Sequence, residues 1–536
     1  MKIKLVFPPT ITYAYGLGFE SNNIPPYGMG IITSILRNNS YFVEQEDLML
    51  KINFYKDNVF LKKRRKKIES IIIKLKDQNL YNSIYKGEIK DKEIILFIDE
   101  ILNYSSFKGF NLIGFSILTF DQFLFSLLLT QRLKQRYNTP IVLGGAFINL
   151  YGDLYPEIFN FVDYMIRGDG GVPLLKLIDY LKGKIPLSEV PNLTYKKDEK
   201  IISNPQQYYP LEDMPVPDFR GLPLEEYRKM GIDLGLPYQI SRGCSNRCPF
   251  CTYYVNERLE FKSFKKVVSE IKEMKERYKS NIFYFCDNAI NNSYEYLDEL
   301  MDSFIENKLD ILWIVYAKIG KLNKEILKKM KEAGCLWLKF GIESGSKNIL
   351  KMMHKGFDIK EAEDTLRYSH EVGIKNRIFL VTGYPYERSE DIINTIRFLK
   401  NNKKYIDRVT IYKFTLEKIS ILNNNAQVYG VKSILPRPCR YALSFDETKG
   451  LKWNKKVIQQ ERNTKKIMKA ILFNGIGEKK NIFIIFVSWW FYTIISKNEK
   501  LRIFLIRNKF INILFIYFIP SKIKATLGYF QGCFVK

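Results

Sequence analysis

Short runs of β-branched and aromatic residues alternate with longer helical stretches in this chain, and the alternation occurs twice. Such alternation is typical of parallel β-sheets, because two parallel strands need a crossover connection that is usually a helix. The first series, residues 1–184, predicts a doubly wound, Rossmann-like α/β domain. The second series, residues 234–430, contains six strand and helix pairs, two fewer than a closed eight-stranded barrel, and predicts a partial (β/α)6 barrel. The expected fold class is therefore α/β.

The expected strands are short and rich in Ile, Val, Leu and aromatic residues. In the first series they cover residues 4–7, 41–44, 112–116, 141–143 and 164–166, with helices at 28–37, 120–137 and 172–181. In the second series the strands cover residues 238–241, 282–285, 311–316, 337–340, 377–381 and 408–412.

Glycine and other small residues follow three strands of the first series, at residues 114–116, 144–145 and 168–171. An open α/β sheet binds ligands at the carboxyl ends of its strands, where the backbone has to approach the ligand closely. Tight turns would equally explain each glycine. The three positions together predict a ligand site at this edge of the sheet.

Two further regions flank the barrel. Residues 185–233 contain seven prolines, which break any long helix, and are expected to be a linker in which 192–203 form a hairpin. Residues 431–536 are helical in tendency. Their apolar run at 482–495 is short for a membrane helix, which needs about 20 residues, so we expect a buried or amphipathic helix with peripheral membrane contact as the alternative.

The chain carries 84 Lys and Arg against 57 Asp and Glu, a net charge of +27. The basic residues are scattered, so nucleic-acid binding is not expected. The run at 62–67 lies in a charged stretch that we interpret as a solvated helical insertion, with a substrate-facing basic arm as the alternative. Seven unevenly spaced cysteines and no signal-peptide pattern indicate a reducing, cytoplasmic location.

Three cysteines stand close together in GCSNRCPFC: Cys244, Cys248 and Cys251, directly after the first barrel strand. Three thiolates on one loop can hold a metal. A structural zinc site needs four protein ligands, and no fourth cysteine is near, while the only histidines are His354 and His370. An iron–sulfur cluster is the better match, because three thiolates can hold three irons and leave the fourth iron open for another ligand.

CxxxCxxC with Phe250 before the third cysteine, on the first loop of a six-pair barrel, resembles the radical S-adenosylmethionine (radical SAM) enzymes. Motifs at 285–288 (FCDN), 316–318 (YAK), 341–346 (GIESGS) and 383–387 (GYPYE) resemble those of the cobalamin-linked branch. The resemblance implies a 4Fe–4S cluster, whose open iron is chelated by S-adenosylmethionine. Reductive cleavage of that molecule then yields a 5′-deoxyadenosyl radical that abstracts hydrogen from a substrate. It also implies an external electron donor such as a flavodoxin or ferredoxin.

The resemblance assigns roles to residues at the strand ends. Glu343 and Ser344 would hold the methionine ammonium and the ribose hydroxyls, and Lys318 the methionine carboxylate. The remaining S-adenosylmethionine contacts that it implies are Phe250, Asp287, Asn288 and Gly383.

The first domain resembles the cobalamin-binding domain that precedes the radical core in this branch, at residues 25–32, 113–119, 143–147 and 167–171. The cobalamin contacts implied by the resemblance are Ser116, Thr119, Gly144, Gly145, Gly168 and Asp169. No histidine precedes His354, so this domain has no imidazole to offer cobalt. No cysteine precedes Cys244, which disfavours a methylthiotransferase with a second cluster in this domain.

The leading hypothesis is a cobalamin-dependent radical SAM methyltransferase acting on an unactivated carbon of a peptide, lipid or small metabolite. A second hypothesis is a peptide epimerase or cyclase without cobalamin, for which Cys286 would be the hydrogen-atom donor. A third, from another class, is a zinc-stapled protein that binds RNA or membrane.

Overall fold

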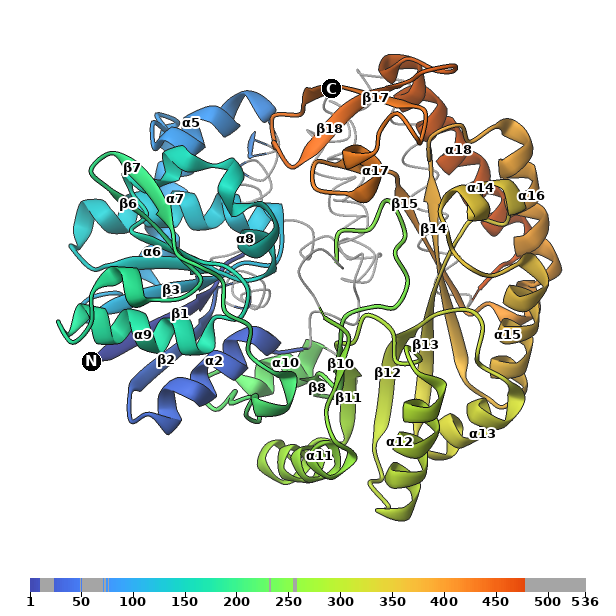
Figure 1. Cartoon of the computed structure of the whole chain (residues 1–536), viewed down its shortest axis with the longest axis horizontal. Helices are drawn as coiled ribbons and strands as arrows, with labels where there is room; N and C mark the ends of the chain where they lie inside the picture. The colour runs from blue at the N-terminus through green and yellow to red at the C-terminus, as the bar shows by residue number, and fades with distance from the viewer. Residues whose placement is uncertain are drawn as a thin grey trace, which may run out of the picture. The chain divides into compact units, whose positions relative to one another are not determined.

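The computed structural model describes residues 1–9, 24–48, 50, 71, 74–75, 77–230, 233–253 and 258–477. The chain folds into two compact units, which divide between Leu234 and Gly235 (Figure 1). The basic run at 62–67 and the apolar run at 482–495 lie outside the described residues. No helix within these ranges is both long enough and apolar enough to cross a bilayer.

The amino-terminal unit is built on a seven-stranded sheet of order β2-β1-β3-β4-β5-β6-β7, whose first five strands are parallel. The order reverses between β1 and β3, which is the switch point where such sheets bind ligands. Its strands are β1 (Lys2–Phe7), β2 (Phe42–Asp47), β3 (Leu112–Ser116), β4 (Ile141–Gly144), β5 (Tyr164–Ile166), β6 (Leu193–Lys197) and β7 (Lys200–Ser203).

The central strands of this sheet are almost continuously buried, because helices cover both faces. One group of helices is α2 (Tyr27–Asn38) with α9 (Gly171–Leu181), and the other is α7 (Phe120–Arg136) with α5 (Tyr81–Lys86) and α6 (Lys92–Asn103). Two further helices are α8 (Ala146–Tyr151) and α10 (Leu224–Met230).

The proline-rich connector is tied into this unit. Strands β6 and β7 form an antiparallel hairpin that pairs with β5, so the expected hairpin is present and extends the sheet. Asp218 forms an ion pair with Arg37, and its main-chain oxygen accepts a hydrogen bond of 2.7 Å from the Gln45 side chain.

The second unit contains a six-stranded parallel sheet of order β15-β14-β13-β12-β11-β8. Its helices lie along one side of the strands (Figure 1). The strands are β8 (Gly235–Tyr238), β11 (Ile282–Phe285), β12 (Leu312–Ala317), β13 (Cys335–Glu343), β14 (Lys375–Thr382) and β15 (Arg408–Lys413). The helices are α11 (Phe264–Tyr278), α12 (Tyr294–Glu306), α13 (Lys324–Glu332), α14 (Lys347–Met352), α15 (Ile359–Glu371) and α16 (Ser389–Asn401).

Strand alternation gives this sheet two unlike faces. The face that packs on the helices carries buried aliphatic side chains such as Val315, Leu338 and Ile378. The other face, called the inner face below, carries Tyr316 and Lys339, which are neighbours on β12 and β13. The expected six-strand, helix-flanked architecture is confirmed.

One strand was predicted three residues too late. β8 covers Gly235–Tyr238, whereas Ser241–Arg242 forms β9, which pairs with β10 (Glu260–Phe261) in a separate two-stranded ribbon. Glycine and proline are poor strand residues in general. β8 is an edge strand, however, and an edge strand tolerates the missing N–H of Pro237 better than a central strand would.

The region after the barrel contains strands that the sequence did not predict. Short strands β16 (Leu416–Glu417), β17 (Val431–Pro436) and β18 (Ala442–Glu447) form an antiparallel sheet of order β16-β18-β17, with α17 (Ile421–Asn424) beside it. The expected helical character is found in α18 (Trp453–Asn474). Helix α18 packs across the end of β14, where the Gln460 amide donates to the carbonyls of Thr382 and Phe414 at 3.1 and 2.9 Å.

Candidate functional site

The loop that carries Cys244, Cys248 and Cys251 begins directly after β9. Gly243 starts the loop in the left-handed region with φ +90°, and a Cβ there would lie 2.5 Å from the Arg258 carbonyl oxygen. The Asn292 side chain fixes the next residues: its amide donates to the Gly243 carbonyl at 3.0 Å and its oxygen accepts from the Ser245 N–H at 3.1 Å. The local sequence therefore turns the backbone sharply and holds the first cysteine at the carboxyl end of the strands.

The far side of the loop packs on the carboxyl-terminal part of the unit. The Cys251 N–H donates to the Cys248 carbonyl at 3.0 Å, and the Leu422 N–H donates to the Pro249 carbonyl at 2.8 Å. The Phe250 ring meets the Tyr384 ring edge-on at 6.1 Å and packs on a buried apolar cluster. Phe250 thus anchors the loop in the core.

The three thiols lie close enough to interact electrostatically. Burial raises the pKa of Cys248, and it raises the pKa of Cys251 to about 12; in both cases the Lys355 ammonium opposes the shift. Within the described ranges, no three His, Cys, Asp or Glu side chains lie in an arrangement that would hold a metal ion. The fit to an iron–sulfur cluster therefore rests on the chemistry of the donors: three cysteines on one loop, with a cation beside them.

Lys355 was not identified from the sequence, although it lies beside the loop. Its ammonium forms an ion pair with Glu343 at 3.4 Å, and its carbonyl accepts from the Asn246 side chain at 3.4 Å. Burial alone would lower the pKa of Lys355, but Glu343 and Cys248 raise it above the usual value. Only tertiary contact reveals this residue, because it lies more than a hundred positions after the cysteines in the sequence.

Glu343 ends β13 at a register shift and has an unusual backbone, with φ +66°. Burial raises the pKa of its carboxyl, and Lys355 counteracts the shift. A non-glycine residue in the left-handed region costs conformational energy and is found preferentially at functional sites.

Lys318 follows β12 and approaches the same loop. Its ammonium donates to the Ser245 hydroxyl, and burial lowers its pKa while Cys244 acts in the opposite direction. Cys248 in turn interacts electrostatically with Glu343. The structure therefore brings Lys318, Glu343 and the cysteine loop close together.

Other predicted contacts have structural partners of their own. Ser344 is buried, with its hydroxyl 3.2 Å from that of Thr395. Gly383 has φ +83°, and a Cβ there would meet the Gln460 side chain of α18 at 2.5 Å. Asn288 is half-buried beside Asp287.

Asp287 lies under the start of the cysteine loop. Its carboxylate accepts hydrogen bonds from the Ser241 hydroxyl at 2.6 Å, from the Ser241 N–H, and from the Ile240 N–H at 3.3 Å. Burial raises the pKa of Asp287 to about 6, against the effect of these hydrogen bonds. In the structure, Asp287 positions the backbone from which the loop departs.

In the amino-terminal unit, Ser116, Thr119, Gly144, Gly145, Gly168 and Asp169 all lie at or just beyond the carboxyl ends of β3, β4 and β5. Gly145 has φ +99°, and a Cβ would lie 2.5 Å from the Ile117 carbonyl oxygen, so chain packing demands glycine there. By contrast, a Cβ on Gly144 would have its nearest neighbour, the Ile166 oxygen, at 3.8 Å. Packing within the chain thus explains the glycine at position 145 but not the one at position 144.

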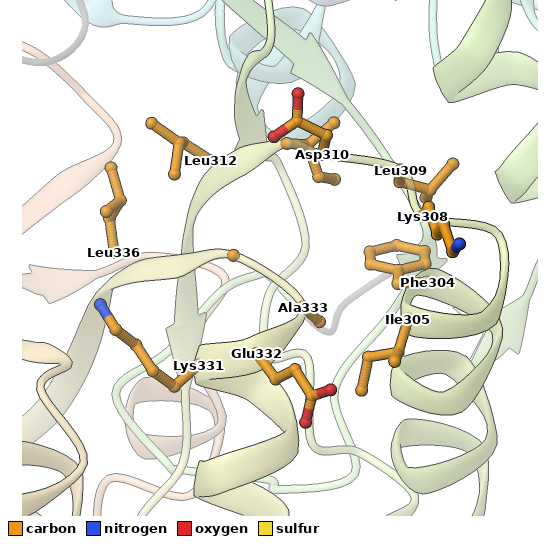
Figure 2. A pocket seen from close by; sticks show the side chains of 12 residues that line it. Phe304, Ile305, Lys308, Leu309, Asp310, Leu312, Lys331, Glu332, Ala333 and Leu336 are labelled. Carbon is orange, nitrogen blue, oxygen red and sulfur yellow. The ribbon is translucent and has the colours of Figure 1, made fainter.

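A cavity of about 470 Å³ lies at the opposite end of the second unit's sheet. Figure 2 shows its lining from the ends of α12 and α13 and the starts of β12 and β13, including Phe304, Asp310 and Glu332. Barrels of this type place chemistry at the carboxyl ends of the strands, so this cavity is separate from the candidate site.

Residues 238–399 match the model of the Radical SAM superfamily. The chain is 26% identical over 267 residues to an uncharacterized methyltransferase of Pyrococcus horikoshii, covering 49% of this chain and 58% of that protein. It is 24% identical over 278 residues to cytidylyl-2-hydroxyethylphosphonate methyltransferase of Streptomyces wedmorensis, covering 45% and 52%. The matched region thus spans little more than half the length of these relatives.

Several solved structures share the fold, among them those of two cobalamin-binding proteins. The radical S-adenosylmethionine methyltransferase TsrM from Kitasatospora setae, determined with cobalamin and a [4Fe-4S] cluster, matches with a TM-score of 0.62 at 15% identity, covering 88% of each chain. The cobalamin-dependent S-adenosylmethionine radical enzyme OxsB, with aqua-cobalamin, matches with a TM-score of 0.63 at 15% identity, covering 97% of this chain and 76% of that one. Residues 238–399 therefore form a Radical SAM domain, and the chain shares its fold with these two cobalamin-binding proteins.

Proposed function

We propose that the protein is a cobalamin-dependent radical SAM methyltransferase that modifies an unactivated carbon. The observation that carries the proposal is the convergence of Lys318 and Glu343 on the loop of Cys244, Cys248 and Cys251 at one end of the sheet. The cation suits the methionine carboxylate of S-adenosylmethionine, the anion suits its ammonium, and the three thiols suit the cluster. Binding of S-adenosylmethionine to a cluster would need all of these groups in one place.

The residues of the second unit would divide the work of binding. The three cysteines would hold a 4Fe–4S cluster, and Lys355 would place a positive charge beside their thiolates. Glu343 would bind the methionine ammonium and Lys318 the methionine carboxylate. With these groups bound, the cluster supplies the electron that cleaves S-adenosylmethionine, and cobalamin supplies the methyl carrier. An external reductant such as a flavodoxin or ferredoxin would deliver the electron to the cluster, in the cytoplasm.

The amino-terminal unit would hold cobalamin at the carboxyl edge of its sheet. Support comes from the switch point between β1 and β3 and from Gly144, where a Cβ would meet nothing closer than 3.8 Å. Because both histidines of the sequence, His354 and His370, belong to the second unit, cobalt would receive no imidazole from this one.

The experiment is an anaerobic reconstitution with iron, sulfide and hydroxocobalamin, followed by metal analysis and an assay for 5′-deoxyadenosine and methylated product. We expect about four irons and one cobalt per chain. Cys248→Ala should lose iron and S-adenosylmethionine cleavage. Cys439→Ala, which removes a thiol outside the loop, is the matched control and should retain both. Zinc in place of iron, or cleavage retained in Cys248→Ala, would refute the proposal.

One observation favours the second candidate, a peptide epimerase or cyclase. The Cys286 thiol is exposed at the end of β11, and because protein surrounds it on other sides, desolvation raises its pKa to about 12. A thiol that stays protonated is what a hydrogen-atom donor requires. Deuterium at a substrate α-carbon after turnover in heavy water, without a mass gain from methyl, would identify this activity, and Cys286→Ala should abolish it.

A further inference from the structure

The inner face of the second unit's sheet carries a ladder of aromatic rings. The Tyr316 ring of β12 stacks on the Phe379 ring of β14 with centroids 5.6 Å apart and planes at 26°. The Phe379 ring stacks in turn on Tyr412 of β15, at 6.0 Å and 21°. The interior of a (β/α) barrel is ordinarily filled by layers of branched aliphatic side chains, so three stacked rings are an unusual lining.

Gly341 makes this stacking across strands possible. It is the residue of β13 that lies beside Phe379 in the register, between the strands of Tyr316 and Phe379. A Cβ on Gly341 would lie 2.5 Å from the Glu343 carboxylate. The ladder therefore passes directly beside the residue proposed to hold the methionine ammonium.

Two cations lie against the rings. The Lys339 ammonium is 5.3 Å from the Tyr316 centroid and 5.5 Å from that of Tyr284. The Arg377 guanidinium is 5.1 Å from the Phe379 centroid and donates two hydrogen bonds of 3.2 Å to the Thr410 hydroxyl. These cation–π contacts fix both charges on the inner face, next to the ladder.

The two ends of the ladder are open while the rest is buried. Tyr316 and Tyr412 are each 43% exposed, whereas Phe379, Lys339 and Arg377 are 7, 9 and 6% exposed. Partly exposed tyrosine side chains beside fixed, largely buried cations favour a ligand that offers both a π-system and a negative charge.

We propose that the Tyr316–Phe379–Tyr412 ladder, with Lys339 and Arg377, is the substrate-binding wall of the enzyme, and that the substrate contains a planar aromatic ring with a carboxylate. The inference rests on the proposed function, since it places the reacting molecule beside Glu343. Stacking on the exposed tyrosine rings orients the plane of the substrate. The two cations set its position along the ladder.

The test is anaerobic equilibrium dialysis of the full-length, reconstituted protein with three small probes. 2-Naphthoate carries both features, decalin-2-carboxylate keeps the charge and the carbon skeleton without the π-system, and 2-naphthamide keeps the rings without the charge. We expect 2-naphthoate to bind about tenfold more tightly than either of the others, a difference of ~1.4 kcal/mol for each missing feature. Equal binding of either control probe, or no binding of 2-naphthoate, would overturn the proposal.

Two pairs of variants locate the site. Tyr316→Leu and Lys339→Met should each weaken 2-naphthoate binding by about tenfold, within the range for a lost ring contact or charged partner. Tyr104→Leu removes a tyrosine of similar exposure, 42%, from the other unit, and Lys375→Met removes a cation held 5.2 Å from the Trp337 ring at the start of β14. Both control variants should bind 2-naphthoate like the parent protein, and uniform behaviour of all four variants would contradict the assignment.

Iron content and S-adenosylmethionine cleavage separate this inference from the proposed function. All four variants should keep the iron of the parent protein. If the parent protein holds no cluster, the proposed function fails whatever the dialysis gives. If it holds the cluster and cleaves S-adenosylmethionine while Tyr316→Leu and Lys339→Met bind 2-naphthoate normally, only the substrate-binding wall is refuted.

Discussion

Asp287 offers a sharp test of how the cysteine loop is held, because its buried carboxylate carries three hydrogen bonds from Ile240 and Ser241. We expect this contact to weaken as the pH rises through the pKa of about 6 that burial imposes on Asp287. The unfolded carboxyl titrates near 3.8. A group whose pKa is raised by folding contributes stability that is fully present below its unfolded pKa and is lost above its folded pKa.

The size of the effect follows from the two pKa values. A difference of about two units corresponds to ~3 kcal/mol between the extremes of pH. Between about pH 4.5 and pH 7 the loss is ~2 kcal/mol, or about 30-fold in a local opening equilibrium.

Hydrogen exchange of the Ser241 amide measures this local opening directly. A local measurement is needed because the chain has two units, so its global unfolding is not expected to be two-state. Asp287→Asn keeps an oxygen in place but does not titrate, so any constant cost of the substitution cancels when two pH values are compared. The ratio of the protection factors of the parent protein and the variant should fall about 30-fold from pH 4.5 to pH 7. A ratio independent of pH would show that Asp287 is not held in the buried environment described here.

Three further predictions concern the same unit. Gly243→Ala should abolish iron binding, because its methyl group would collide with a backbone carbonyl. The control Gly320→Ala, at φ +85° with nothing within 4 Å of a Cβ, should bind iron normally. Equal iron content in the two variants would contradict the role of the turn. Glu343→Gln should weaken S-adenosylmethionine binding in dialysis by about tenfold or more without loss of iron, as expected for a charged hydrogen bond worth ~1.5–3 kcal/mol, and unchanged affinity would remove Glu343 from the site. Lys456→Met breaks a buried ion pair of 2.6 Å with Glu447 and should lower the free energy of unfolding of this unit by ~3 kcal/mol in urea titrations. The control Lys455→Met, at the exposed neighbouring residue, should change this free energy little. Equal stability of the two variants would refute the importance of the pair.

The sequence predicted the regular part of the fold well because periodicity and strand composition report directly on burial. β3, β5 and β11 have the expected bounds. β17 and β18 were missed because they depend on pairing with each other, and most residues of β17 are not buried. β8 begins earlier than predicted because an edge strand tolerates Gly235 and Pro237, which are poor strand residues in general.

The site was predictable only where its chemistry lies in a linear motif. Cys244, Cys248 and Cys251 are visible as spacing. Lys355 is invisible at that level, because it approaches the loop only through the folded structure. A position at the end of a strand also does not show whether a side chain points at a ligand or supports the backbone. In the structure, the Asp287 carboxylate supports the backbone, because it accepts a hydrogen bond from the Ser241 N–H.

The β6–β7 hairpin determines where the chain can be divided for experiments. β6 pairs along the whole of β5. The outer strand β7 is short, begins with Lys200 and is followed closely by Pro205, features that discourage association through a sheet edge. A fragment that stopped at residue 184 would leave the backbone groups of β5 without their partner and should aggregate. The amino-terminal unit should therefore be produced with its proline-rich connector attached, ending near Leu234.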